Sequence, residues 1–518
     1  MIRTRLAKGV AAAVAAALGQ TAVAGTDIYF NPLTQSSAVA TPNHVNELSS
    51  PWQTPAGLSQ ENLTSLREAE ADMNQSLIRV PGADTSATML DMSAFSPNGK
   101  WLFLPHETPW GAGASRYDLA NDRVEIIFQG DGGGLDENWA NDYGAFDPAF
   151  FTPNGTLFLG EEWTAEGRII EILNPFAPAG QIQWRELESI ANVAHEGMQF
   201  SADGRTFYFV DEWNSGSFYK FVTAKKGDYT KGQTFVLSVD AFGGDPAANY
   251  NEGMNATATR TGLATWVPIT DKNGKPLTQT DPFRNGPTED PREDPTARGG
   301  RAAADEVRGT PYGRPEDMEI GRLANGREVL YIAVTSENAI YSIELLSPTK
   351  AIVRVAASEA NTPKNLGFPA TTGRLNSPDN LAQDALGNIY VVEDAPNGQD
   401  VGGDIWFMRD TDGDGVAESL DHFMSIQVDG AEATGMIFNP VKPTQFVVTV
   451  MHPDSVTIPD GFGDAVWTFD LENIAPPVCD RNGWRYTQTC THAGDYRFID
   501  MLKRADRRDR KRWDWDWR

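Results

Sequence analysis

The chain has 518 residues, with 71 acidic against 43 basic side chains and a formal net charge of −28. A chain this acidic repels nucleic acid and attracts cations, so no nucleic-acid partner is expected. Beyond the N-terminal segment no apolar run approaches the roughly 20 residues of a membrane-spanning helix, so no transmembrane segment is expected.

The first 24 residues have the order of a secretory signal peptide. Arg3, Arg5 and Lys8 precede an Ala- and Val-rich run over residues 9–18, and the small residues Ala22-Val23-Ala24 follow. Basic, apolar and small residues in this order predict export and cleavage after Ala24. The mature protein is therefore expected in the periplasm or secreted.

Residues 25–85 form an N-terminal lead-in with few strand signals. Within it, residues 59–74 have helix-forming character, with Leu63, Leu66 and Met73 as their apolar positions.

One pattern then recurs six times between residues 86 and 475. An acidic residue stands four positions before an apolar residue, a turn usually ending in Gly follows, and an alternating run ends the copy. Turns such as Ser96-Pro97-Asn98-Gly99 predict that each copy is a β-hairpin. The copies occupy residues 91–107, 147–162, 194–212, 316–337, 379–394 and 432–453.

The intervals between the copies hold further strands, which predicts an all-β protein, a six-bladed β-propeller without exposed sheet edges. Those strands are expected at 115–129, 167–173, 218–222, 339–344, 404–409 and 464–470. Residues 254–312, rich in Pro, Gly, Arg and Asp, are expected to be an inserted loop over one face.

Residues 476–518 follow the last blade. Cys479 and Cys490 are the two cysteines of the chain, and in an oxidising compartment they are expected to form a local disulfide; a metal site with His492 is the alternative. The basic end, KRADRRDRKRWDWDWR, fits a solvated terminus or a segment that docks on a surface or partner.

The acids that open the copies form the main functional signal. In a propeller the first strand of each blade lines the central channel, so acids at one height on these strands converge and repel one another unless cations bind. Hard oxygen ligands in this number suit Ca²⁺. The acids are Asp91, Asp147, Glu196, Glu316 and Asp379, with Thr434 in the sixth copy and Glu432 two residues before it.

Neighbouring groups extend this candidate site. Glu161, Glu162 and Asp394 are further candidate ligands, and Arg314, two residues before Glu316, is placed to hold a phosphate oxygen. The alternatives are that the acids cap turns and that Arg314 forms a plain salt bridge. The segment DTDGDGVAE at 410–418, with Asp410, Asp412 and Asp414, fits either a structural calcium site or a solvated hairpin tip.

At these same residues the sequence resembles the PhoX-type alkaline phosphatases, secreted calcium- and iron-dependent phosphomonoesterases with a six-bladed propeller. The matching segments include TPNGTLFLGEEW, AHEGMQF, GRPEDMEI, NSPDNLAQDALGNIYVVED and EATGMIFNP. The resemblance implies that Glu196, Glu316, Asp379 and Glu432 hold metals and that Arg314 contacts phosphate. Gly160 stands where the family has an iron-ligating Cys, so calcium with little or no iron (Fe³⁺) is expected.

These observations lead to the hypothesis of a secreted, metal-dependent phosphoric-ester hydrolase acting on a small phosphoester. Carboxylate-bound ions would polarise the phosphoryl oxygens and activate water, while Arg314 neutralises charge on the phosphoryl group. Two alternatives remain open: another calcium-propeller hydrolase, phytase-like or lactonase-like, and a non-catalytic calcium-stabilised propeller that binds a partner or surface.

Overall fold

The structure is a computed structural model. It describes residues 28–39, 45–73, 90–136, 138–163, 166–283, 299–397, 400–453 and 461–474. The expected signal peptide, the Cys479 and Cys490 pair and the Trp-bearing tail lie outside these residues, as do residues 284–298 of the insertion. Strands dominate the described elements, which confirms the β class.

Two four-stranded antiparallel sheets come first along the chain, and in each sheet the strands follow their sequence order. The first contains β3 (Ala94–Phe95), β4 (Trp101–His106), β5 (Gly113–Asp118) and β6 (Arg123–Gln129); the second contains β7 (Phe146–Phe151), β8 (Leu157–Glu161), β9 (Ile169–Ile172) and β10 (Trp184–Glu186).

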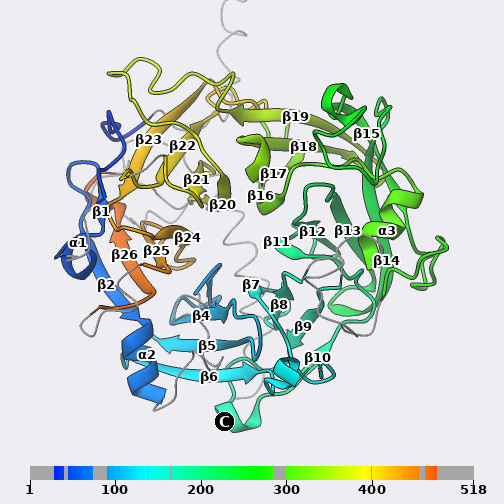
Figure 1. Ribbon diagram of the computed structural model, residues 1–518, viewed down its shortest axis with the longest axis horizontal. Coiled ribbons are helices and arrows are strands. Elements are labelled where there is room, and N and C mark those ends of the chain that lie inside the picture. Colours follow the sequence, from blue (N-terminus) through cyan, green and yellow to red (C-terminus); the bar gives the residue numbers. More distant parts are fainter. Residues whose placement is uncertain are drawn as a thin grey trace, which may run out of the picture.

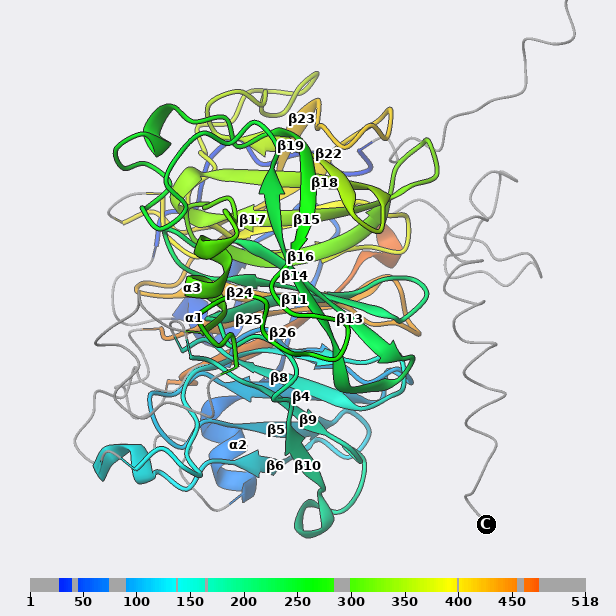
Figure 2. The same cartoon turned by 90° about the vertical axis from the view of Figure 1, so that its right-hand side faces the viewer.

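A nine-stranded sheet follows, in which two four-stranded meanders are joined at their outer edges by one extra strand (Figure 2). Its order is β11 (His195–Phe200), β12 (Thr206–Asp211), β13 (Phe218–Lys225), β14 (Asp228–Val239), β15 (Gly262–Pro268), β19 (Lys350–Ser358), β18 (Ala339–Ser347), β17 (Glu328–Val334) and β16 (Pro315–Arg322).

The last two sheets each take up a strand from the N-terminal region. One contains β20 (Pro378–Gln383), β21 (Ile389–Glu393), β22 (Asp404–Arg409), β23 (Ser419–Ile426) and β1 (Trp52–Gln53); the other contains β24 (Glu432–Phe438), β25 (Gln445–Met451), β26 (Ala465–Asp470) and β2 (Gln60–Ser65).

The sheets surround a common axis, with β7, β11, β16, β20 and β24 nearest the centre (Figure 1). Each of these first strands contacts the next one around the axis, and β3 lies between β24 and β7 to complete the circuit. The chain therefore has the predicted propeller-like arrangement, and the first strands of all the meanders meet at its centre.

Apolar side chains fill the space between neighbouring sheets. Phe158 of β8 packs against Phe200 and Phe207 of the next sheet, and Phe209 stacks on Tyr219 with ring centroids 5.2 Å apart. Because both faces of most sheets are covered in this way, many strands are buried at nearly every position, as β11 and β21 are.

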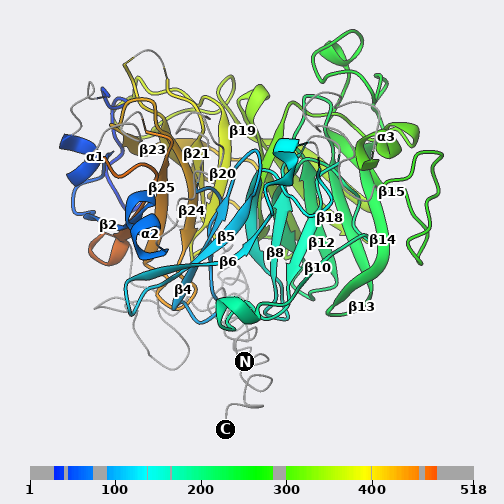
Figure 3. The same ribbon diagram turned by 60° about the horizontal axis from the view of Figure 1, so that its bottom comes forward.

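The lead-in differs in part from expectation. Its helical segment begins only at Leu66, as α2 (Leu66–Met73), whereas Gln60–Ser65 is the strand β2 that pairs with β26 and completes the last sheet. Tertiary pairing overrides the weak strand propensity of QENLTS. The short helix α1 (Val45–Ser49) and α2 lie at the rim beside β2 (Figure 3).

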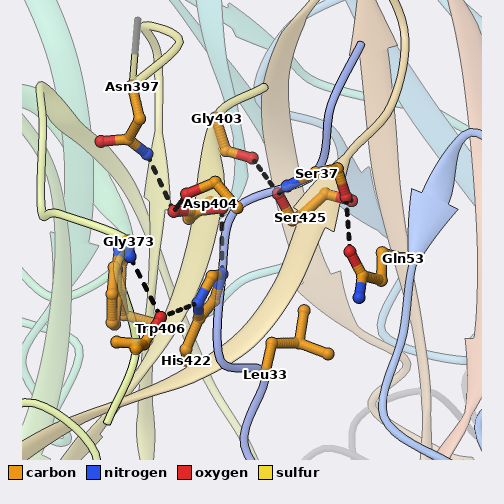
Figure 4. A network of polar contacts seen from close by, with 12 residues as sticks. Leu33, Ser37, Gln53, Gly373, Asn397, Gly403, Asp404, Trp406, His422 and Ser425 are labelled. Carbon is orange, nitrogen blue, oxygen red and sulfur yellow. Dashed lines mark hydrogen bonds and ion pairs between the residues drawn. The ribbon is translucent and has the colours of Figure 1, made fainter. Parts of the chain in front are cut away.

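The N-terminal residues 28–39 run along the outside of the sheet that contains β22 and β23. The Ser37 amide donates to Ser425 Oγ (2.8 Å), and beside it the buried carboxylate of Asp404 lies 2.9 Å from His422 Nε2 (Figure 4). Asn397 Nδ2 donates to the other oxygen of Asp404 (2.8 Å). This segment and β2 tie the start of the chain to its last two sheets.

The insertion is more than a loop. It contributes β15, which bridges β14 and β19, and the helix α3 (Gly299–Glu306) at the rim opposite α1 and α2 (Figure 3). Within the described residues none of the helices is long and apolar enough to cross a membrane.

Candidate metal centre

Four of the acids that open the sequence copies lie near the start of a first strand, at a shared irregularity. In β7, β11, β16 and β20 the pairing register with the second strand shifts beside the acid, as a β-bulge, and in β24 it shifts after Thr434. Asp91 precedes β3. A bulge redirects side chains locally. At Gly197, the bulge residue after Glu196, a Cβ would lie 2.6 Å from the Met318 backbone nitrogen, so glycine permits β11 to approach β16 closely.

Among the described residues, three groups of buried or half-buried carboxylates lie in this central region. Each group has one oxygen per residue within 4.8 Å of the others. Asp147 belongs to two groups and Glu196 to two, so the groups form a continuous series. They are Asp91 with Glu107 and Asp147, Asp147 with Glu162 and Glu196, and Glu196 with Glu316 and Asp379.

Among the described residues, two oxygens in this series, Asp147 Oδ1 and Glu196 Oε2, are buried without a hydrogen-bond donor. Glu316 Oε1 forms no hydrogen bond either, but it lies 3.3 Å from the Arg314 guanidinium. A buried carboxylate oxygen without a donor costs free energy unless a cation or a proton compensates. The donor set is made of hard oxygens and fits Ca²⁺ better than metals that prefer sulfur.

Electrostatics support the same conclusion. Burial, followed by the charges of neighbouring acids, raises the pKa of Asp147 and Glu196 well above the usual range. The same two causes raise the pKa of Glu162, Asp379 and Glu432 well above theirs. Burial also raises the pKa of Glu316 well above its usual range, where Glu212 adds to the shift and Arg314 opposes it. The state in which all of these carboxylates are ionised and no cation is bound is therefore unfavourable, and binding of protons or cations stabilises the cluster.

The ends of four of the second strands supply a further acid to the centre, and of this set Glu107 and Glu212 were not among the predicted ligands. In β4, β8, β12 and β21 the last strand residue faces into the sheet, and the next residue turns toward the axis because strand side chains alternate. The pairs are His106 and Glu107, Glu161 and Glu162, Asp211 and Glu212, and Glu393 and Asp394.

Glu161 was predicted as a metal ligand, but its side chain points away from the central groups and pairs with Arg168. Both of its oxygens accept hydrogen bonds from Arg168, at 2.5 Å from Nε and 2.9 Å from Nη2, and the Gly144 amide donates to Oε1. Its side chain is fully buried. Glu162 rather than Glu161 therefore joins the central groups.

Arg314 is the residue directly before β16, and its side chain contacts acids of the centre. Its Nε lies 2.5 Å from Glu212 Oε1 and 3.3 Å from Glu316 Oε1, and its side chain is 40% exposed. These two acids and Asp379 raise the pKa of Arg314 even though burial lowers it, so the guanidinium stays charged. The salt bridge expected as the alternative is present, and the hydrogen bond that Arg314 donates within the described residues comes from Nε.

The sixth position, Thr434, is a polar link rather than a ligand. Its hydroxyl donates to Asn380 Oδ1 (2.6 Å) and contacts Asp91, and the Gly435 amide donates to the same Asn380 oxygen. Glu432, also a predicted ligand, lies outside the three groups, with its Oε2 3.2 Å from His452 Nε2. Charges on Asp394 and Asp91 help raise its pKa, which puts it at the edge of the cluster.

Gly160, in β8, lies close to Pro148 of β7 and His195 of β11. A Cβ there would lie 2.9 Å from Pro148 Cγ and 3.0 Å from His195 Cβ. The His195 ring is fully buried, and burial lowers its pKa to about 3 although a backbone contact with Ala191 opposes the shift. The chain therefore offers no thiolate here, and little room for one.

The acidic loop after β22 lies apart from the centre. Asp410, Asp412 and Glu418 bring one oxygen each within 4.8 Å, whereas Asp414 is not part of this group. Asp410 Oδ1 accepts hydrogen bonds from the amides of Gly413 and Asp414. Glu418, at the end of the sequence motif, takes the place expected for Asp414.

Comparisons with known proteins give one strong match. The family described as alkaline phosphatase PhoX matches residues 108–454, which is more than half of the chain. None of the curated proteins matches the sequence.

Similar solved structures share little sequence with the chain. A gluconolactonase from Xanthomonas campestris is 10% identical, with a TM-score of 0.39 over 86% of this chain and 98% of that one. A calcium-binding regucalcin from Agrobacterium tumefaciens is 11% identical, with a TM-score of 0.33 over 74% of this chain and 91% of that one. The assignment therefore depends on the family match: the chain belongs to the PhoX alkaline phosphatase family.

Proposed function

We propose that the chain is a calcium-dependent phosphomonoesterase of the alkaline phosphatase type, exported to the periplasm or secreted. The observation that carries this proposal is the position of Arg314, whose Nε contacts Glu212 and Glu316 at the edge of the linked carboxylate groups. Family membership supports the reaction class and a small phosphoester as substrate. Counting the nine-stranded sheet as two blades joined through β15 gives a six-bladed propeller.

The residues of the three groups would hold the ions, with Glu212, Asp394 and Glu432 around them. Bound calcium would supply Lewis-acid stabilisation of the phosphoryl oxygens and a water of lowered pKa. Because Asp147 and Glu196 each belong to two groups, they would contribute to holding ions in both. The absence of a side chain at Gly160 favours calcium over iron, since iron in this family position is expected to need the Cys thiolate.

Arg314 would bind the phosphate. Its Nε is used by Glu212 and Glu316, which leaves the two Nη groups to donate to phosphoryl oxygens, and its 40% exposure lets a ligand reach them. Two acids that hold the guanidinium from different strands limit its motion. A preorganised cation stabilises charge that develops on the phosphoryl group in the transition state.

We also propose that Asp410 and Asp412, with Glu418, hold a structural calcium ion in the loop after β22. The spacing of Asp410, Asp412 and Gly415 and the approach of Glu418 support this. This ion would stabilise the loop and take no part in the reaction.

The test combines metal content and activity on one sample of the mature protein. Elemental analysis is followed by hydrolysis of p-nitrophenyl phosphate at alkaline pH, before and after EGTA. Calcium with EGTA-sensitive turnover is the expected result. Calcium without turnover would favour the non-catalytic, partner-binding propeller, and a protein without metal would overturn the proposal.

A further inference from the structure

Arg314 has an unusual backbone. Its φ is +56°, in the left-handed region that side-chain-bearing residues rarely adopt. Such a conformation is unfavourable for a residue with a side chain and persists only when surrounding contacts fix it.

The peptide units on both sides of Arg314 are bonded. The Arg314 amide donates to Trp213 O (3.1 Å), and Thr335 N donates to Arg314 O (3.0 Å). One residue earlier, the Gly313 amide donates to Glu337 Oε1 (2.9 Å). Glu337 is the side chain that holds this backbone, because the other contacts come from main-chain groups.

Glu337 is itself fixed by the insertion. Both Nη groups of Arg260 bind its two oxygens, at 2.7 Å for Nη2 and Oε2, and the Tyr341 hydroxyl donates to Oε2 (2.8 Å). The side chains of Arg260 and Glu337 are 15% and 8% exposed. A planar guanidinium that binds a carboxylate through two nitrogens fixes its orientation as well as its place.

The segment just before the insertion packs directly on Gly313. A Cβ at that glycine would lie 2.6 Å from Tyr250 Cε1, so the tyrosine ring occupies the space of a side chain. The Tyr250 hydroxyl donates to Ser336 O (2.7 Å), and Arg260 lies over the same ring at 5.3 Å. Tyr250 and Arg260 thus cover the turn that precedes Arg314.

We propose that Arg260 and Glu337 are positioning residues for phosphate: they hold the left-handed turn at Gly313 and Arg314, and thereby place the Arg314 guanidinium between Glu212 and Glu316. The inference rests on the proposed role of Arg314 as the phosphate-binding group. It assigns the insertion a part in substrate binding through residues that touch neither ion nor substrate.

A matched ion pair serves as the control. Arg409 and Asp421, on β22 and β23, are 15% and 0% exposed, with Arg409 Nε 2.9 Å from Asp421 Oδ2. Removing Arg409 breaks a pair of similar burial that has no contact with Arg314. Stability loss alone would therefore affect both variants alike.

The experiment compares Arg260→Ala, Arg260→Lys and Arg409→Ala in the calcium-loaded full chain. We expect Arg260→Ala to weaken competitive inhibition by inorganic phosphate about 10- to 100-fold, as outer supporting residues commonly do. Calcium affinity should stay within about threefold of the unaltered protein. Arg260→Lys should recover part of the loss, and Arg409→Ala should show none.

Hydrogen exchange of the peptide that spans Tyr312 to Arg314 gives a second readout independent of activity. Faster exchange in Arg260→Ala, and not in Arg409→Ala, is expected, since the Gly313 amide loses its fixed acceptor. Equal exchange or equal phosphate inhibition in the two alanine variants would overturn the inference. A protein that neither binds nor hydrolyses phosphate would refute the proposed function, while the exchange result would still decide whether Arg260 and Glu337 hold the turn.

Discussion

The Nε atom of Arg314 lies 2.5 Å from Oε1 of Glu212, an acid that belongs to the other meander of the nine-stranded sheet. Glu212 follows β12, the second strand of its meander, whereas Arg314 precedes β16, the first strand of the other meander, so the contact joins the two meanders. The guanidinium is therefore held in a fixed position beside Glu316, a candidate metal ligand of β16.

Replacing Arg314 with Ala should abolish phosphate recognition without dismantling the centre. We expect kcat/KM for p-nitrophenyl phosphate to fall about 10²- to 10³-fold, the usual cost of removing one preorganised donor. Calcium content should stay unchanged, because no predicted ligand is lost. Arg322→Ala, at the exposed far end of β16, is the matched control; a loss of calcium equal to the loss of activity would contradict the assignment.

Glu161 and Glu162 should separate into a structural and a metal-binding role. Glu161→Gln breaks a buried ion pair with Arg168 and should lower the free energy of unfolding by about 3–5 kcal/mol. Glu162→Gln removes one of several repelling acids, so it should weaken calcium binding while leaving the metal-free protein at least as stable. Calorimetry of calcium binding and denaturant unfolding of both variants check this, and equal effects on the two quantities would contradict it.

The same pair shows how far the sequence could predict the centre. Asp91, Asp147, Glu196, Glu316 and Asp379 could be predicted as central acids, because each stands at the same position in its copy of the repeat. Glu107 and Glu212 were missed, since in an unaligned sequence a strand-end acid looks like any turn acid. Which of Glu161 and Glu162 faces the axis depends on where β8 ends, and the doublet alone does not define that residue.

Strands that are determined by local sequence patterns could be predicted, whereas strands that form by pairing with distant segments could not. The hairpins carry alternating residues and turn glycines, so their strands were located from the sequence. Residues 60–65 become β2 only because β26 offers an unpaired edge, and residues 262–268 become β15 only because two sheet edges face each other. Neither partner is visible in the segment itself.

Calcium should stabilise the protein more strongly as the pH rises. In the metal-free protein burial raises the pKa of Asp91, one of the central acids, to about 7, against about 4 in the unfolded chain. A pKa raised by folding gives stability that is complete below the unfolded pKa and is lost as the pH passes the folded pKa.

The contribution of Asp91 to the stability of the metal-free protein should therefore fall between about pH 4 and pH 7. Thermal unfolding with calcium and with EGTA, recorded across this range, should show a difference in Tm that widens with pH. A difference that stays constant or narrows would mean that calcium does not compensate the buried charge of Asp91.

Gly160 should resist any side chain. Because a Cβ would press on Pro148 and His195, we expect Gly160→Ala to lower the free energy of unfolding by about 1–3 kcal/mol. Gly160→Cys should cost at least as much. Gly180→Ala, where a Cβ meets no atom within 4 Å, is the control. A fully stable Gly160→Cys protein that gains iron would show that the site still accepts the thiolate.

The pairing of β2 with β26 has a consequence for synthesis and quality control. A strand made near the start of the chain must wait for one made some 400 residues later, since the register joins Gln60 to Phe469. Until then β2 has no partner and the last sheet lacks its outer strand. A chain that is terminated before β26 would carry all the acids of the centre but would leave both β2 and β25 with an open edge, which makes it a target for aggregation or proteolysis.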